Sequence, residues 1–385
     1  MKKIIAMKKI TIPAPLIIII EDVGWWNGFD GSSLNQPFRT GMNRQHCPED
    51  YKALALLGKK MGTQIIAGFV WCEWDRDNQL GKIPSATWMG DRWDNPVKNI
   101  RLFEEAADII NKNLNNIETG FHGLGHEFWK NGVASRTEFH DFNGNMRNKE
   151  EIIRHFKAFA KICENSEIKA PWPEIFIPPA LKHSFGNNGA GFQRILRNFG
   201  FKFVITVFDK AKKYAPPLYK KFTKECGVTL IERGVSPVKW NVISAEPVFS
   251  FKWPILSLHW SNILHFNPEK NISVVKKWAD FLIKGADEHS FIILHNVKEA
   301  LVQLIYSNIV EIKNLEKGVI INLEKARDVL PDSPKNNIYV KTNFSQKKPI
   351  TIRGGRIINV SEQKNNTIIK IKPNKNKNIE LSFNH

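Results

Sequence analysis

Three short segments of the sequence carry side chains that could bind a metal ion or move a proton. The first is Glu21-Asp22, which directly follows the isoleucine run at 17–20. Adjacent carboxylates at the end of an apolar strand are costly to bury unless a metal ion or another partner compensates them. Asp22 could therefore supply an oxygen ligand, which leaves Glu21 free to act as a base. A helix cap or a plain turn is the alternative interpretation.

The second segment places His122 and His126 four residues apart, among glycines and directly after a predicted strand. This spacing predicts a helical turn with both imidazoles on one face, where they can bind one metal ion. Surface or helix-capping histidines are the alternative. The third segment ends at His295, where a histidine at a strand tip is well placed for proton transfer near neutral pH. An ordinary strand-end histidine is the alternative there.

Short apolar runs alternate with amphipathic stretches along most of the chain. Strands are predicted at 15–21, 64–71, 116–121, 174–177, 201–207, 228–232, 254–259 and 291–294. Helices are predicted at 48–61, 97–115, 149–163, 191–198, 273–284 and 297–307. The alternation indicates an α/β fold with parallel strands, and seven or eight such units in about 310 residues favour a (β/α) barrel over an open sheet. Catalytic groups gather at the carboxyl ends of barrel strands, where all three segments fall.

The chain divides into two predicted domains. Residues 1–330 form the barrel, and residues 331–385 form a small β-module. The second region has no helical period, and its strand-like pieces alternate with turns rich in Asn, Lys and Gly. It would serve as a scaffold or an additional glycan contact.

Composition narrows the class of protein further. The 385 residues carry a net charge of +18, but the excess is spread through Lys-rich surface sequence, which makes nucleic acid a poor candidate partner. The four cysteines form no C-x-x-C pair, which argues against a disulfide scaffold. No apolar run approaches the length of a membrane helix or of a signal peptide, so we expect a cytoplasmic protein with no membrane partner.

Taken together, the three segments resemble the polysaccharide deacetylase (NodB-homology) superfamily of carbohydrate esterases, the group of carbohydrate esterase family 4. Glu21-Asp22 matches the acid pair that ends its first strand. His122 and His126 match its paired histidines, and His295 completes its final Leu-His dipeptide. The motifs follow one another in the family's order over most of the chain.

The resemblance implies a distorted (β/α) barrel and a hydrolase that removes an N- or O-acetyl group from a sugar. Asp22, His122 and His126 would hold one divalent metal ion, most simply zinc. Glu21 takes the position of the family's general base, and His295 takes that of its general acid.

The sequence departs from the family pattern at four places. Residues 177–179 read Ile-Pro-Pro, so the arginine that steadies the base in the family has no counterpart there. Glu21 replaces an aspartate, Gly123 replaces Ser or Thr, and Asn296 replaces an acid. The metal ligands are intact, so metal binding is the firmer expectation and acetyl specificity the weaker one.

Tryptophans gather at predicted strand ends and in the loops between them, where indole rings can stack on sugars. Core packing is the alternative for each of them. The long loop 25–47 would cover the substrate. The residues expected to contact substrate are Trp25, Trp26, Trp74, Trp129, His259 and Trp260.

Two other functions fit the same sequence. A glycoside hydrolase on a similar barrel would use Glu21 with Glu73 or Glu246 as paired carboxylates and would need no metal. A non-catalytic carbohydrate-binding barrel would bind its ligand without turnover.

Overall fold

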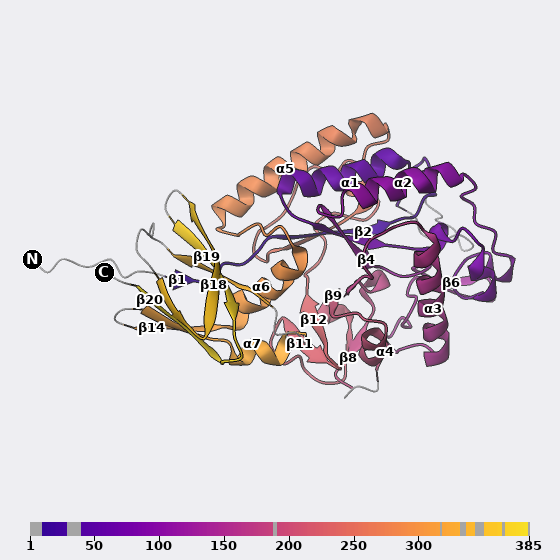
Figure 1. Cartoon of the computed structure of the whole chain (residues 1–385). Coiled ribbons are helices and arrows are strands. Elements are labelled where there is room, and N and C mark those ends of the chain that lie inside the picture. The colour runs from indigo at the N-terminus through magenta and orange to yellow at the C-terminus, as the bar shows by residue number, and fades with distance from the viewer. Residues whose placement is uncertain are drawn as a thin grey trace, which may run out of the picture.

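A twisted eight-stranded sheet forms the centre of the molecule (Figure 1). The computed structural model describes residues 10–28, 40–187, 191–315, 318–331, 336–342, 350–363 and 366–383. The sheet order is β11-β12-β9-β7-β4-β3-β2-β13, and every neighbouring pair is parallel except β11 with β12. Its strands are β2 (Ile17–Val23), β3 (Ile65–Phe69), β4 (Ile117–Phe121), β7 (Ile175–Phe176), β9 (Phe203–Thr206), β11 (Phe222–Glu225), β12 (Val228–Glu232) and β13 (Ile255–His259).

The sheet is parallel because its strands are apolar on both faces. Strand β2 reads IIIIEDV and is buried along its whole length, as a parallel strand covered on both sides must be. The sheet curls into a half-barrel and carries helices between its strands. The predicted α/β class is thereby confirmed.

Helices cover the sheet, and their ends follow local sequence signals. Helix α1 begins at Pro48 and is capped after Met61 by Gly62, which adopts a φ of +67°. Helix α1 packs against both α2 and α5 on one side of the sheet (Figure 1). The α-helices are α1 (Pro48–Met61), α2 (Ile100–Lys112), α3 (Lys149–Asn165), α4 (Phe192–Asn198), α5 (Asn271–Glu288), α6 (Val297–Ile309) and α7 (Glu324–Val329). Short 3₁₀ helices occupy Cys72–Trp74, Gln79–Lys82, Gly90–Arg92, Pro179–Leu181, Phe208–Lys210, Trp260–Ile263 and Pro268–Lys270.

One predicted strand, at 291–294, is wrong. Only Ile292 bridges to the segment before β2, opposite Pro15. The next carbonyls of the segment, those of Leu294 and His295, accept instead from the Thr63 hydroxyl and the Gln64 N–H, so pairing with the segment before β2 stops after one bridge.

Two pairs of very short strands flank the sheet. They are β5 (Phe128–Lys130) with β6 (Val133–Ser135), which are antiparallel, and β8 (Ser184–Phe185) with β10 (Lys212–Lys213), which are parallel. Among the described residues, none of the helices combines the length and the apolar character needed to cross a bilayer.

Two four-stranded antiparallel sheets form a β-module at one end of the molecule (Figure 1). One contains β1 (Ile10–Thr11), β16 (Ile338–Thr342), β19 (Asn366–Pro373) and β18 (Gly355–Gln363). The other contains β14 (Glu311–Leu315), β15 (Gly318–Asn322), β20 (Asn378–Phe383) and β17 (Ile350–Arg353). The region after Pro331 is therefore built of strands, but β14, β15 and β1 join it from earlier in the chain.

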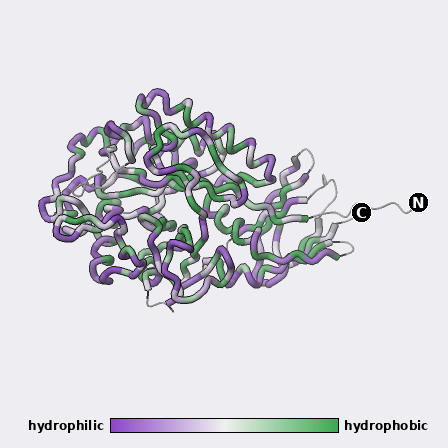
Figure 2. The backbone as a smooth tube through the Cα atoms, turned by 180° about the vertical axis from the view of Figure 1, so that it is seen from behind, coloured by the Kyte–Doolittle hydropathy of each residue, from purple (hydrophilic) through white to green (hydrophobic). Residues whose placement is uncertain are grey.

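Helix α6 joins the module to the central sheet. The Gln303 side chain donates from Nε2 to the carbonyls of Pro13 and Tyr339, 2.9 Å each. Buried Leu301 and Ile305 belong to the same apolar cluster as Val340 of β16. The hydrophobic stretches run through the interior of both parts (Figure 2), so the module and the sheet share one core.

Candidate metal centre and cavity

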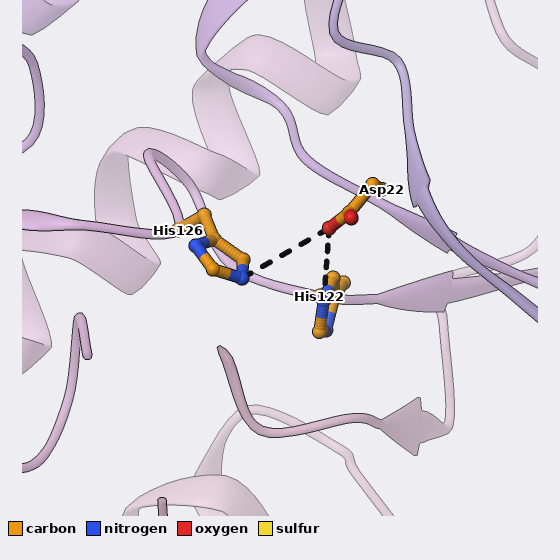
Figure 3. Close-up of side chains that lie close together, drawn as sticks. All are labelled: Asp22, His122 and His126. Carbon is orange, nitrogen blue, oxygen red and sulfur yellow. Dashed lines mark ion pairs between the residues drawn. The ribbon is translucent and has the colours of Figure 1, made fainter. Parts of the chain in front are cut away.

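Asp22, His122 and His126 meet at the carboxyl ends of β2 and β4 (Figure 3). The Asp22 Oδ1 atom lies 3.3 Å from His122 Nε2 and 3.9 Å from His126 Nε2. All three side chains are buried, and one ligand atom from each lies within 4.8 Å of the others. The structure thus brings together the three predicted ligands.

The backbone at both segments is bent away from regular structure. Asp22 has a φ of +63°, and the β2–β3 register shifts between Ile20 and Val23. Because of this irregularity, the side chains of the successive acids Glu21 and Asp22 can both lie at the carboxyl end of the sheet.

The predicted helical turn at 122–126 is wrong. The segment is a tight non-helical loop in which Gly123 has a φ of +107° and His126 a φ of +63°. The buried Glu138 carboxylate accepts hydrogen bonds from the backbone N–H groups of Leu124, Gly125 and His126 at 2.9 to 3.2 Å. These bonds replace those of a helix and hold the second histidine in place.

The two glycines of this loop are required sterically. A Cβ at Gly125 would lie 1.8 Å from the Ala86 carbonyl oxygen. A Cβ at Gly123 would lie 2.4 Å from the Glu138 carboxylate. The loop can therefore close on Glu138 only when both residues lack side chains.

Each histidine points its Nε2 atom toward Asp22 because its Nδ1 atom is engaged elsewhere. His122 Nδ1 donates to the Ile177 carbonyl at 2.9 Å. His126 Nδ1 lies 3.2 Å from the Glu127 carboxylate. Such contacts fix the tautomer that leaves Nε2 free to bind a metal ion.

The donor set fits a divalent metal ion. It offers two imidazole nitrogens and one carboxylate oxygen, and within the described part of the chain the Asp22 Oδ1 atom has no hydrogen-bond donor although it is buried. Burial would raise the pKa of Asp22, but the surrounding histidines, His122 first, hold that pKa well below its usual range. The carboxylate is therefore ionised and ready to bind a cation.

Glu21 lies beside this cluster with an arginine partner that the sequence motif seemed to lack. Arg233, the residue after β12, places Nη2 3.0 Å from Glu21 Oε1, and Ser257 Oγ donates to the same oxygen at 3.0 Å. Burial alone would raise the pKa of Glu21, but Arg233 and then His122 lower it below its ordinary value. The expectation that Glu21 lacks an arginine partner is therefore corrected. The arginine, Arg233, follows strand β12 and not the Ile-Pro-Pro segment at 177–179.

His259 faces Glu21 across the β2–β13 pair. The two residues are register partners, and His259 Nε2 lies 3.7 Å from Glu21 Oε2. Burial lowers the pKa of His259 below its ordinary value, although the nearby Asp22 and Glu21 carboxylates act to raise it. The neutral ring can accept a proton from Glu21.

His295 does not reach this site, so its predicted role as the acid is corrected. Its backbone carbonyl accepts from Gln64 N at 2.9 Å, and Gln64 precedes β3, at the opposite end of the sheet. The Leu-His dipeptide occurs three times in the sequence, and the structure brings the first one, ending at His259, to the ligands.

A cavity of about 860 Å³ opens over the cluster. Its buried lining residues include Glu21, Asp22, His122, His126 and Arg233, with His259 partly exposed beside them. Its outer lining residues include Arg136, Phe142, Lys182, Lys210, Lys239 and Trp240.

The predicted substrate-binding tryptophans do not line this cavity, which is a correction. Trp26 and Trp74 pack on each other in the core with ring centroids 5.6 Å apart, and Trp260 stacks on His46 at 3.9 Å. Trp25 is buried with its ring centroid 5.2 Å from that of His126. These large aromatic rings are buried in the core, which removes their apolar surface from water, and they are not exposed at the strand ends.

Two further predictions concern the surroundings of the site. Trp129 is buried on β5 and absent from the cavity lining, so its predicted substrate contact is also corrected. Of the loop 25–47, residues 29–39 lie outside the described residues. Trp240 does line the cavity, and its position in the loop between β12 and β13 was the available sequence signal.

The comparisons with known proteins leave the family open. No protein-family model and no curated protein matches the chain. Among solved structures, an alpha-amylase from H. orenii is similar over 77% of this chain and 68% of that one, with 11% identity and a TM-score of 0.16. A likeness of that size carries no argument about fold or activity.

Proposed function

We propose that the protein is a metal-dependent hydrolase that removes an N- or O-acetyl group from a carbohydrate. One observation carries the proposal: an ionised carboxylate and a histidine face each other on adjacent strands, beside a buried Asp-His-His cluster and under an open cavity. Zinc is the ion we propose for the cluster, because two imidazoles and one carboxylate are a common catalytic zinc set. The half-barrel is then a divergent form of the distorted barrel of the polysaccharide deacetylase superfamily.

The residues divide the chemistry between them. Asp22, His122 and His126 would hold the ion, which polarises an acyl carbonyl and lowers the pKa of water when bound. Glu21 accepts the proton of the attacking water, and Arg233 keeps its carboxylate ionised until then.

His259 completes the proton path. The proton on Glu21 passes to the neutral His259 ring, 3.7 Å away, and from there to the departing nitrogen or oxygen of the sugar. A bond forms between water oxygen and the acyl carbon, and the acyl C–N or C–O bond breaks. The products are acetate and the free amine or hydroxyl.

The other two functions fit the cavity less well. A glycoside hydrolase needs two separated carboxylates, but Glu73 is buried away from the cavity and Glu246 pairs with Lys277 on the surface. Among the described lining residues, only Glu21 and Asp22 carry carboxylates, and they are adjacent. A binding-only barrel would have no need of the buried Glu21–Arg233 pair.

Metal content and acetate release test the proposal together. Untagged protein prepared without chelator should carry about one equivalent of metal, and His122→Ala/His126→Ala should carry none. The matched control His265→Ala/His289→Ala should keep it, because neither residue lines the cavity. Zinc-loaded wild type should release acetate from acetylated oligosaccharides without producing new reducing ends, and Glu21→Gln should retain metal but lose turnover. No metal uptake even after zinc addition, or turnover unchanged in Glu21→Gln, would refute the proposal.

A further inference from the structure

We infer that the substrate is an anionic saccharide, with a carboxylate or sulfate-type group close to the acetylated unit. The inference rests on the proposed function and adds its substrate class. Its basis is the cationic rim, defined as Arg136, Lys182, Lys210 and Lys239, the lysines and arginine that line the outer cavity.

The charges of the cavity are separated by depth. The acids of the described lining, Glu21 and Asp22, are buried and compensated by Arg233 and by the histidines. The rim carries four cations from four separate segments of the chain and no acid. A concave site lined by one sign of charge concentrates ligands of the opposite sign.

The three rim lysines have no acidic partner in the described part of the chain. Among the described residues, no carboxylate lies within 4.0 Å of the ammonium groups of Lys182, Lys210 or Lys239. On the helices, exposed lysines are commonly paired, as Lys112 is with Asp108 at 2.6 Å. These three lysines therefore keep their positive charge available to a ligand.

Two aromatic rings on the rim carry stacked cations. The Lys182 ammonium lies 4.8 Å from the Phe142 ring centroid, and the Arg136 guanidinium lies 5.6 Å from that of Trp240. Phe142 is 80% exposed, so its ring is accessible to a ligand. A sugar ring that stacks on such a surface would bring its anionic substituent beside the cation.

Binding of matched N-acetylated hexasaccharides tests the inference by calorimetry, with and without added zinc. The probes are neutral chitohexaose, a hyaluronan hexasaccharide with carboxylates and a chondroitin sulfate hexasaccharide that adds sulfate esters. The charged probes should bind more tightly than chitohexaose, and the difference should shrink between about 50 and 300 mM salt. Comparison of the two charged probes shows which anion the rim prefers.

Two variants that lose the same number of charges distinguish an effect of the rim lysines from an effect of the protein's net charge. Lys182→Gln/Lys210→Gln/Lys239→Gln should weaken binding of the preferred charged probe about tenfold and leave chitohexaose unaffected. The control replaces Lys60, Lys157 and Lys276 by Gln, because these exposed lysines lie on helices outside the cavity lining. No preference for a charged probe, or an equal loss in the control, would overturn the inference.

Acetate assays on the same samples keep the two proposals apart. A rim-dependent preference for charged probes without acetate release would support the anionic ligand and contradict the deacetylase function. Equal acetate release from neutral and charged probes, with no effect of the rim variants, would support the deacetylase function and contradict the anionic substrate.

Discussion

At the scale of single residues, two histidines compete for the role of proton donor, and their positions decide between them. His259 Nε2 lies 3.7 Å from Glu21, whereas His295 lies exposed at the other end of the sheet. His259→Asn should reduce kcat for acetate release by about 10²- to 10⁴-fold, because proton transfer to the leaving group is lost. His295→Asn is the matched control and should turn over like wild type. Equal rates in the two variants would remove His259 from the proton path.

The Glu21–Arg233 pair should contribute to folding as well as to chemistry. Both side chains are almost fully buried, at 4% and 1% exposed. Arg233→Gln leaves the Glu21 carboxylate buried without its cation, and the free energy of unfolding at pH 7 should fall by about 3 to 5 kcal/mol. Urea denaturation measures this loss.

A double-mutant cycle isolates the pair. Glu21→Gln/Arg233→Gln removes both charges and should regain part of the stability that Arg233→Gln loses. If the two single losses simply add in the double variant, the pair is not coupled.

At the scale of elements, Glu138 links helix α3 to the ligand loop. Its carboxylate binds three loop N–H groups, and its Oε1 atom lies 2.8 Å from His155 Nδ1 on α3. Burial would lower the pKa of His155, but the carboxylates of Glu138 and then Glu151 raise it above its ordinary value. A helix thus holds a metal ligand in place through one intermediate carboxylate.

Glu138→Gln should weaken zinc binding by about 10- to 100-fold, because the amide replaces one acceptor oxygen and weakens the link to His155. Glu151→Gln is the control: Glu151 also contacts His155, at 3.8 Å, but accepts no hydrogen bond from the described loop N–H groups. Competition with a chelator measures both affinities. A similar loss in both variants would assign the effect to helix α3 rather than to the loop.

Helices and strands that are specified by nearby residues could be predicted from the sequence. Features that depend on contacts between distant segments could not. The range of α1 follows from Pro48, an apolar period and Gly62, all within one segment. The shape of the ligand loop depends on Glu138, which no spacing rule connects to it. The Arg233–Glu21 pair depends on the order of strands in the sheet, which a local pattern does not reveal. The three metal ligands were predictable because their strands end at the same edge.

At the scale of the whole molecule, buried neutral histidines set the response to acid. Burial, and then the charge of Arg147, lower the pKa of His140 to about 3. Burial also lowers the pKa of His183, whose ring centroid is 5.2 Å from that of His140. Both rings stay neutral in the folded protein, while in the unfolded chain they take up protons near their ordinary pKa of about 6.5.

The sign of this linkage makes the folded state less stable in acid. Because the unfolded chain binds more protons, the contribution of His140 is lost as pH falls from about 6.5 toward 3, and at pH 5 the loss is about 2 kcal/mol. His140→Gln, whose amide can keep the contact to Ser184, should therefore lose less unfolding free energy between pH 7.5 and 5.0 than wild type. His155 has a raised pKa and acts in the opposite direction, but it is present in both proteins and cancels in the difference. Urea denaturation at the two pH values measures the change, with His265→Gln, at a partly exposed histidine, as the control. Equal losses in all three proteins would show that His140 does not control acid stability.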